Sequence, residues 1–144
     1  MNKDEFRFLK IIQKLDMFKQ LNLEEARRLL NICKAITFDA RQRIYHIGDE
    51  SHDMLILVQG KLIQKDRAEQ VLGEILPGFS VGEMGFLTGH CRLVHTDAVI
   101  KSTGLAMSKT DFDELMKKDR EMYIKILENA VDLLAHRLTG TSHS

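Results

Sequence analysis

The chain has 144 residues, of which 44% are apolar and 29% charged, the profile of a globular domain and not of a disordered segment. This length allows one domain with a substantial core and is too short for two ordinary domains. Lysine plus arginine equals aspartate plus glutamate at 21 each, so the basic excess usual for a nucleic-acid-binding protein is missing. Two cysteines, Cys33 and Cys91, exclude a disulfide framework of the secreted kind.

The sequence contains no signal for a membrane or for secretion. No apolar run approaches the length of about 18 residues that a transmembrane helix needs. The N-terminal MNKDEFRFLK mixes acidic and basic residues and has no uninterrupted apolar segment, so it does not fit a secretory signal. We therefore expect a cytoplasmic location and no contact with a membrane.

Residues 1–36 show the apolar spacing of helices. In FRFLKIIQKLDMF the apolar residues at 8, 11, 12, 15 and 18 share one helical face. Asn22 followed by Glu25 is the pattern of a capping box ahead of a second helix, ARRLLNICKAI. On that helix Cys33 is expected to be a small buried hydrophobe.

Residues 37–107 change to the pattern of short strands. The apolar runs RIYHI, MLILV, KLIQ and EQVLGEI are separated by turn signals such as GDESHD, QGK and PG. Their spacing of roughly 8–12 residues is typical of an antiparallel sandwich, roll or barrel. Eight of the nine glycines and the only proline, Pro77, lie in this region, where glycine suits tight corners.

The helical period returns over residues 108–139. Ser108 or Thr110 can cap DFDELMKK, and REMYIKILENAVDLLAHRL follows as a longer helix. That helix has two apolar rows, whereas a monomer surface helix needs only one. The second row indicates a partner, such as the same helix of another copy, and burial of both rows within one chain is the alternative. The rows are Tyr123, Leu127, Ala130, Leu134 and Leu138, and Met122, Ile126 and Leu133.

The segment VGEMGFLTGHCRLVH, which begins at Val81, places one carboxylate and one arginine among three glycines. Glycines at these positions let backbone N–H groups face one concavity, an arrangement that binds anions. Arg92 suits a phosphate, which it can hold through two parallel hydrogen bonds. Glu83 would repel a phosphate but can accept a hydrogen bond from a sugar hydroxyl. From the spacing alone two interpretations stay open: a ligand that carries both groups, or a Glu83–Arg92 ion pair that fixes the loop.

The cassette GEMGFLTGHCR resembles the phosphate-binding cassette of cyclic nucleotide-binding domains. These domains are the sensory modules of bacterial catabolite-activator-type regulators and of protein kinase A regulatory subunits. The flanking segments RIYHIGDESHDMLILVQGKL and DAVIKSTGLAMSKTDFDEL are similar to the first hairpins and the last strands of that family, so the resemblance covers about residues 15–139. The family cassette begins Gly-Glu, continues with an apolar residue and then Gly or Ala, and has an arginine nine residues after the glutamate. The matching residues are Gly82, Glu83, Met84, Gly85 and Arg92.

The resemblance implies one domain over residues 1–144, mainly β with flanking helices (α+β). Its centre would be an antiparallel β-roll, a double-stranded β-helix of the jelly-roll type, over 37–107 with the cassette at 82–94. N-terminal helices would occupy 1–36, and a pair of C-terminal helices, the B and C helices of the family, would occupy 108–139. Residues 140–144 are expected to form a flexible tail.

The resemblance also implies a set of ligand contacts. Arg92 would bind the exocyclic oxygens of the cyclic phosphate, and Glu83 would accept the ribose 2′-hydroxyl. Backbone N–H groups near Gly82, Gly85 and Leu93 would complete the cradle. The expected ligand-binding set is Gly82, Glu83, Met84, Gly85, Arg92 and Leu93.

The C-terminal helix of the family acts as a lid over the base and, in the bacterial regulators, as the dimer interface. In those regulators a Thr-Ser pair on this helix can contact adenine. The similar AHRLTGTS of this chain makes Thr141 and Ser142 weaker candidates for a contact with the base.

The chain departs from the family pattern directly after the arginine. Family members usually continue with small residues, whereas Arg92 is followed by Leu93 and Val94. Leu93 supplies no hydroxyl and more bulk, although its backbone N–H remains available. A threonine at this position often accompanies a preference for guanine, so Leu93 favours cAMP, with cGMP as the alternative ligand.

We therefore expect a bacterial, non-enzymatic regulatory module that binds a cyclic nucleotide and has no output domain of its own. It would signal through movement of the C-terminal helix or through an unidentified effector protein, and it would form a homodimer through that helix. The alternative is a degenerate roll that acts as a protein interaction module and binds no nucleotide. Because the chain ends before a helix-turn-helix domain could fit and its net charge is zero, we do not expect it to bind DNA alone.

Other reactive residues point to no catalytic chemistry. The six histidines have no metal-ligand spacing, and no nucleophile pattern or pair of catalytic carboxylates stands out, so neither a metal nor a cofactor is expected. His90, Cys91 and His95 flank the cassette and are expected to be solvent-exposed loop residues.

Overall fold

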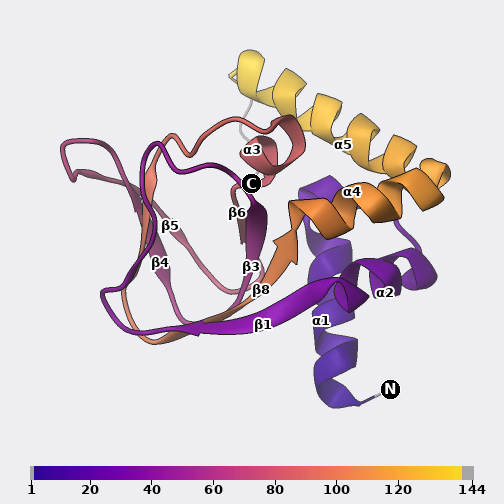
Figure 1. The fold of residues 1–144 in the computed structure, drawn as a ribbon, viewed down its shortest axis with the longest axis horizontal. Helices are drawn as coiled ribbons and strands as arrows, with labels where there is room; N and C mark the ends of the chain where they lie inside the picture. The colour runs from indigo at the N-terminus through magenta and orange to yellow at the C-terminus, as the bar shows by residue number, and fades with distance from the viewer. Residues whose placement is uncertain (1, 141–144) are drawn as a thin grey trace. The chain divides into compact units, whose positions relative to one another are not determined.

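The computed structural model describes residues 2–140, which divide into two compact units. One unit joins residues 2–31 to residues 113–140 and is helical. The other unit is Ile32–Phe112, which contains the strands and one short helix (Figure 1). Thr141 and Ser142, the candidates for a contact with the base, lie outside the described residues.

The capping groups expected from the sequence lie at the starts of two helices. Asn22 and Glu25 form the expected capping box, since each backbone N–H donates to the side chain of the other, at 3.0 and 2.8 Å. Ser108 is the cap of the following C-terminal helix, because its Oγ accepts from the N–H of Asp111 at 3.3 Å. Within residues 2–140 no helix combines the length and the apolar character needed to cross a membrane. The helices are α1 Lys3–Lys14, η1 Asp16–Phe18, α2 Leu23–Asn31, α3 Glu83–Thr88, α4 Lys109–Lys118 and α5 Arg120–Leu138.

The second N-terminal helix is shorter than its apolar spacing predicts. Helix α2 ends at Asn31, and the next residues form strand β1, Cys33–Phe38. This strand pairs with the last strand in continuous antiparallel register, and such pairing overrides a modest helical preference. Cys33 therefore lies on a strand and is half-buried, and desolvation raises the pKa of its thiol to about 12.

In the part of the chain that the structure describes, eight strands form two four-stranded antiparallel sheets, which confirms the expected β-roll with flanking helices. The first sheet has the order β1-β8-β3-β6 and the second has the order β2-β7-β4-β5. The short helix α3 joins β6 to β7 and so carries the cassette from one sheet to the other (Figure 1). The remaining strands are β2 Arg43–Tyr45, β3 Asp53–Gln59, β4 Leu62–Lys65, β5 Val71–Ile75, β6 Ser80–Val81, β7 His95–Ala98 and β8 Ser102–Ser108.

The core of the roll is built from side chains of both sheets. Leu55 and Leu57 of β3 are fully buried and lie in one cluster with Leu62 of β4. Burying each such leucine contributes about 1.5–3 kcal/mol, so the cluster fixes the register of β3. As a result the start of β3, at Asp53, is held firmly beside the cassette. The cluster also contains Phe38, Val81 and Ala98.

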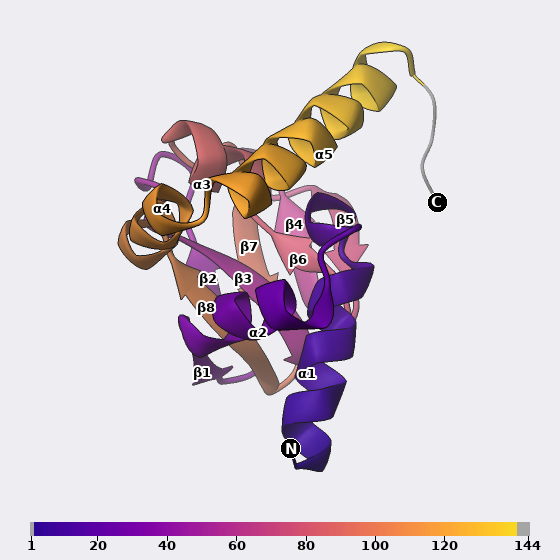
Figure 2. The same ribbon diagram turned by 90° about the vertical axis from the view of Figure 1, so that its right-hand side faces the viewer.

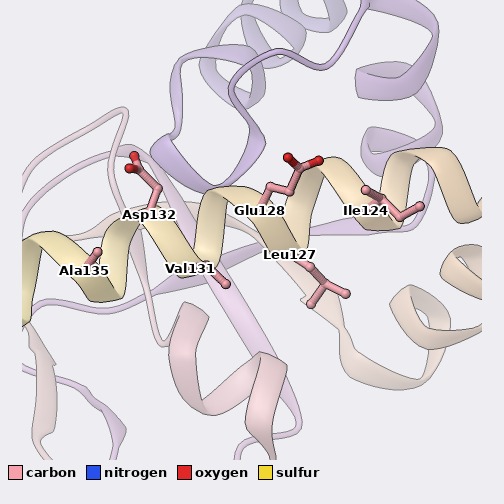
Figure 3. Close-up of a pocket in the computed structure, with 6 residues that line it drawn as sticks. All are labelled: Ile124, Leu127, Glu128, Val131, Asp132 and Ala135. Carbon is pink, nitrogen blue, oxygen red and sulfur yellow. The ribbon is translucent and has the colours of Figure 1, made fainter.

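Helix α5 is a single long helix (Figure 2). It has one buried and one exposed apolar face. Met122, Ile126 and Ala130 are buried, so Ala130 belongs to the buried face and not to the row with Leu127 in which the sequence placed it. The opposite side of the helix exposes a second stripe, so the two apolar rows are not both buried within the described chain. Figure 3 shows Leu127 and Val131 pointing away from the carboxylates of Glu128 and Asp132. We call this exposed stripe the apolar strip, and it consists of Ile124, Leu127, Val131, Leu134 and Leu138.

A buried amide ties α5 to the 3-10 helix η1. The Nδ2 of Asn129 donates to the carbonyls of Met17 at 2.9 Å and Lys19 at 2.8 Å. Asn129→Ala leaves both carbonyls without their donor and is expected to lower the free energy of unfolding by about 1–3 kcal/mol. Urea denaturation measures this loss. Glu128→Ala, at the next and exposed position of the same helix, should change stability by less than about 0.5 kcal/mol. Equal effects of the two variants would contradict the role of the amide.

Candidate functional site

The structure gathers the predicted cassette residues around the start of α3 and the segment that follows it. Gly82 precedes α3 in the left-handed region, with φ 84°, and Glu83 is the first residue of the helix. Met84 and Gly85 continue the first turn. Arg92 and Leu93 lie between α3 and β7.

Arg92 is the buried charge of the site. Its side chain is only 6% exposed, and its Nη2 donates to the carboxylate of Asp53 at 2.8 Å and to the Asp53 carbonyl at 2.7 Å. The Nε and Nη1 atoms of the same guanidinium are buried and have no hydrogen-bond partner among residues 2–140. Buried donors are almost always paired, so two orphaned N–H groups on one cation indicate a place for an absent acceptor.

An aromatic ring packs against one face of the guanidinium. The Arg92 carbon Cζ lies 3.8 Å from the centroid of the Tyr45 ring, a cation–π contact. The Tyr45 hydroxyl donates to Oδ1 of Asp53 at 2.9 Å, so one carboxylate oxygen accepts from both residues. Burial, and then the Asp53 charge, raise the pKa of Tyr45, which keeps the phenol neutral and able to donate. Tyr45 and Asp53 thereby fix the plane and the position of the guanidinium.

The backbone of Arg92 is held on both sides by the turn between β2 and β3. The Arg92 N–H donates to the Asp49 carbonyl at 2.8 Å, and the Gly48 N–H donates to the Arg92 carbonyl at 2.8 Å. Ser51 from the same segment donates from Oγ to the His90 carbonyl at 2.6 Å. These contacts fix the position of the Arg92 backbone relative to the ring of Tyr45.

Two glycines of the cassette have no room for a side chain. A Cβ on Gly82 would overlap Nη1 of Arg92, and a Cβ on Gly85 would lie 2.6 Å from Oγ of Ser51. Gly82 thus makes room for the guanidinium of Arg92, and Gly85 allows α3 to approach the segment from 90 to 92.

Glu83 and Arg92 do not form the ion pair that was one interpretation of their spacing. The carboxylate partner of Arg92 is Asp53, and its other donors have no partner among the described residues. Glu83 is half-buried, and its Oε2 accepts from the hydroxyl of Ser80 at 3.2 Å. The two charges of the cassette are therefore held separately.

The residues on either side of Arg92 differ from each other in exposure. Leu93 is 83% exposed, so its side chain is not packed in the roll of the described chain. His90 and Cys91 are exposed, as expected. His95 is not a solvent-exposed loop residue: it begins β7, and its side chain is only 14% exposed.

Sequence reasoning missed Tyr45, Asp53 and Ser51 as members of the site. All three lie in RIYHIGDESHDM, which resembles only a hairpin of the family. A carboxylate directly before the buried run MLILV is a signal that could have pointed to Asp53, since a charge at the end of a core strand needs a partner.

The geometry defines a roll that presents a buried, partly unsatisfied arginine beside a glycine-rich helix start. The family model for the cyclic nucleotide-binding domain matches residues 35–119, which is more than half of the chain. The chain belongs to the cyclic nucleotide-binding domain family. No curated protein matches the sequence.

Solved structures share the fold at low sequence identity. A cyclic nucleotide-binding domain from Methylobacillus flagellatus KT is 21% identical, with a TM-score of 0.80 over 96% of this chain and 80% of that one. The N-terminal domain of a transcriptional regulator from Streptomyces coelicolor is 16% identical, with a TM-score of 0.82 over 92% and 96%. The regulatory domain of Toxoplasma gondii protein kinase A, crystallised with cAMP, is 18% identical, with a TM-score of 0.73 over 85% and 50%.

The contact between Gly82 and Arg92 can be tested against a matched glycine. Gly82 and Gly89 both have left-handed backbones, with φ 84° and 81°, but a Cβ on Gly89 would meet nothing within 4 Å. Gly89→Ala should therefore lose only the backbone preference, about 1–2 kcal/mol. Gly82→Ala should lose at least about 1 kcal/mol more, because it must also displace the buried guanidinium. Chemical denaturation of both variants measures the difference, and equal losses would refute the contact.

Proposed function

We propose that this chain is a non-enzymatic sensory module that binds a cyclic nucleotide, with the cyclic phosphate on Arg92. The observation that carries the proposal is the pair of unpartnered donors, Nε and Nη1, on a cation that is 6% exposed. A phosphate accepts two parallel hydrogen bonds from a guanidinium and neutralises its charge, which a water molecule cannot do. The family of the chain and the relative crystallised with cAMP support this choice of anion.

The second charge of the cassette suits the sugar of the same ligand. Glu83 is separate from Arg92 and is oriented by Ser80, so it can accept a hydrogen bond from the ribose 2′-hydroxyl. Backbone N–H groups near Gly82, Gly85 and Leu93 complete the contacts to the phosphate, and Met84 lies on the same helical turn. The N–H of Leu93 is available because no described residue accepts from it.

We assign cAMP as the preferred nucleotide. Leu93 has no hydroxyl for a contact with guanine, which favours cAMP over cGMP. Its side chain is 83% exposed, so its bulk does not fill the space beside the guanidinium within the roll. Binding then shifts the population of C-terminal helix arrangements, and an effector protein responds to that shift.

Titration calorimetry of the purified chain with cAMP and with cGMP tests the ligand. Heat is expected with cAMP, and Arg92→Ala should weaken binding by at least about 2–3 kcal/mol, as for a charge-assisted pair. Arg92→Lys keeps the positive charge but cannot donate two parallel hydrogen bonds to the phosphate. Its affinity for cAMP should therefore lie between those of Arg92→Ala and the wild type. Arg27→Ala, an arginine on α2, is the control and should bind as the wild type does.

The result that overturns the proposal is the absence of heat with either nucleotide at millimolar concentration. That outcome would favour the second function, a roll that acts only as a protein interaction module. An Arg92→Ala variant with unchanged cAMP affinity would remove the arginine from the site even if binding occurred.

We further propose that the apolar strip of α5 pairs with the same strip of a second copy. Val131 is 65% exposed and Leu138 is 87% exposed on the strip, on a helix whose opposite face is already buried. Isolated exposed apolar residues are ordinary on a protein surface, whereas a row at helical spacing is the pattern of a paired helix.

Light scattering tests the pairing. The wild type should have about twice the chain mass of 16.6 kDa, and Val131→Glu should return it to the mass of one chain because a charge in a paired seam is not compensated. Lys117→Glu places the same carboxylate on an exposed position of α4 outside the strip. This variant should keep the mass of the wild type. A wild type with the mass of one chain at high concentration would refute the pairing.

A further inference from the structure

His95 holds the turn that precedes β3 through a ring nitrogen. The backbone N–H of Ile47 donates to Nδ1 of His95 at 3.1 Å. A backbone N–H can only donate, so Nδ1 must carry a lone pair, and a neutral ring therefore has its proton on Nε2. The ring is mostly buried, with 14% of the side chain exposed, and Nε2 faces the carboxylate of Glu69 at 3.5 Å.

The turn held by His95 also holds the backbone of Arg92, and we call its two hydrogen bonds to Arg92, from Gly48 and to Asp49, the clamp. Ile47 is followed by Gly48 and Asp49, whose backbone groups make both hydrogen bonds to the backbone of Arg92. The chain from Arg92 to His95 and the turn from Ile47 to Asp49 therefore close a small ring of hydrogen bonds. Loss of the bond from Ile47 loosens one side of the clamp on the arginine.

We propose that His95 is a positioning residue for the nucleotide site, and that its protonation weakens binding by releasing the turn at Ile47–Asp49 from Arg92. A protonated ring has a donor at both nitrogens, so Nδ1–H would face the N–H of Ile47 and the bond would be lost. This inference rests on the proposed binding of a cyclic nucleotide at Arg92. Arg92 makes the contact with phosphate, and His95 acts only through the backbone that carries it.

Charged groups of both signs surround the ring. The carboxylate of Glu69 lies 3.5 Å from Nε2, and Arg43 binds the same carboxylate at 2.6 Å. The groups that face His95 or its immediate partners are His46 from the turn, Arg43 from β2, Lys65 from β4, Glu69 from the loop after β4, and Asp97 from the same strand.

Amide hydrogen exchange on the ligand-free protein tests the structural half of the proposal. The amides of Gly48 and Arg92 are both donors in the clamp, and the amide of Leu57, which donates to the Phe79 carbonyl, is a reference within the same roll. In His95→Ala, protection of Gly48 and Arg92 should fall at least about tenfold while that of Leu57 is unchanged. The wild type should show the same selective loss when the pH is lowered from about 8 to about 5.5, after correction for intrinsic exchange rates.

The affinity for cAMP as a function of pH tests the functional half. His95→Asn places an oxygen where Nδ1 lies and cannot titrate, so it should bind cAMP within about threefold of the wild type at high pH and lose the dependence on pH. The wild type should bind about tenfold more weakly at low pH, which is the loss of one hydrogen bond. His95→Ala should bind weakly at every pH. His46→Asn, which changes an exposed neighbour, should keep the wild-type profile.

The outcomes separate this inference from the proposed function. If no variant binds either nucleotide, the proposed function fails, and the exchange of Gly48 and Arg92 still decides whether His95 holds the clamp. If cAMP binds but the wild type and His95→Asn have the same pH profile, the role of His95 is wrong and the ligand site stands. Nitrogen chemical shifts that place the proton of the neutral ring on Nδ1 would also overturn the inference.

Discussion

The guanidinium of Arg92 is the constraint around which the roll is arranged. A cation removed from water needs an opposite charge, and the carboxylate of Asp53 at 2.8 Å supplies it. That carboxylate meets only the Nη2 edge of the group, and Nε and Nη1 remain buried without partners. An unsatisfied buried donor costs about 1–3 kcal/mol, so these two N–H groups need an acceptor.

The surrounding contacts divide into those that neutralise the arginine and those that orient it. Asp53 and the ring of Tyr45 act on the side chain, while Gly48 and Asp49 act on the backbone. Gly82 acts on the side chain as well, because a Cβ at this position would overlap Nη1 of the guanidinium. A single buried charge thus explains why a tyrosine, an aspartate and a glycine from distant parts of the chain must meet at one place.

Local patterns predicted the short antiparallel strands and the helix starts, and the resemblance to the family predicted the roll and the cassette. Glycines at fixed offsets, a capping box at Asn22 and short apolar runs each depend on neighbouring residues alone. The missed features depend on pairing across the chain: β1 formed at Cys33 because β8 lies beside it, and Asp53 became the partner of Arg92 because two segments 39 residues apart are brought together. The spacing of Glu83 and Arg92 left an ion pair open as an alternative, and only the fold shows that the arginine already has another partner.

The unsatisfied arginine also bears on the choice between a ligand-binding module and a roll that only binds proteins. A buried ion pair can often be replaced by apolar residues of similar volume with a gain of about 1–4 kcal/mol, so a roll without a ligand has no physical need for Arg92. A bound anion would give Arg92 a role, because it would accept hydrogen bonds from Nε and Nη1. It would also place a second negative charge beside a guanidinium that Asp53 contacts only at Nη2. In the proposed complex the anion accepts from Nε and Nη1, so ligand binding and the arrangement of the cassette become one equilibrium. Leu93 does not alter this balance, because the position of the guanidinium is set by the turn and the aromatic ring and not by the exposed side chain that follows it.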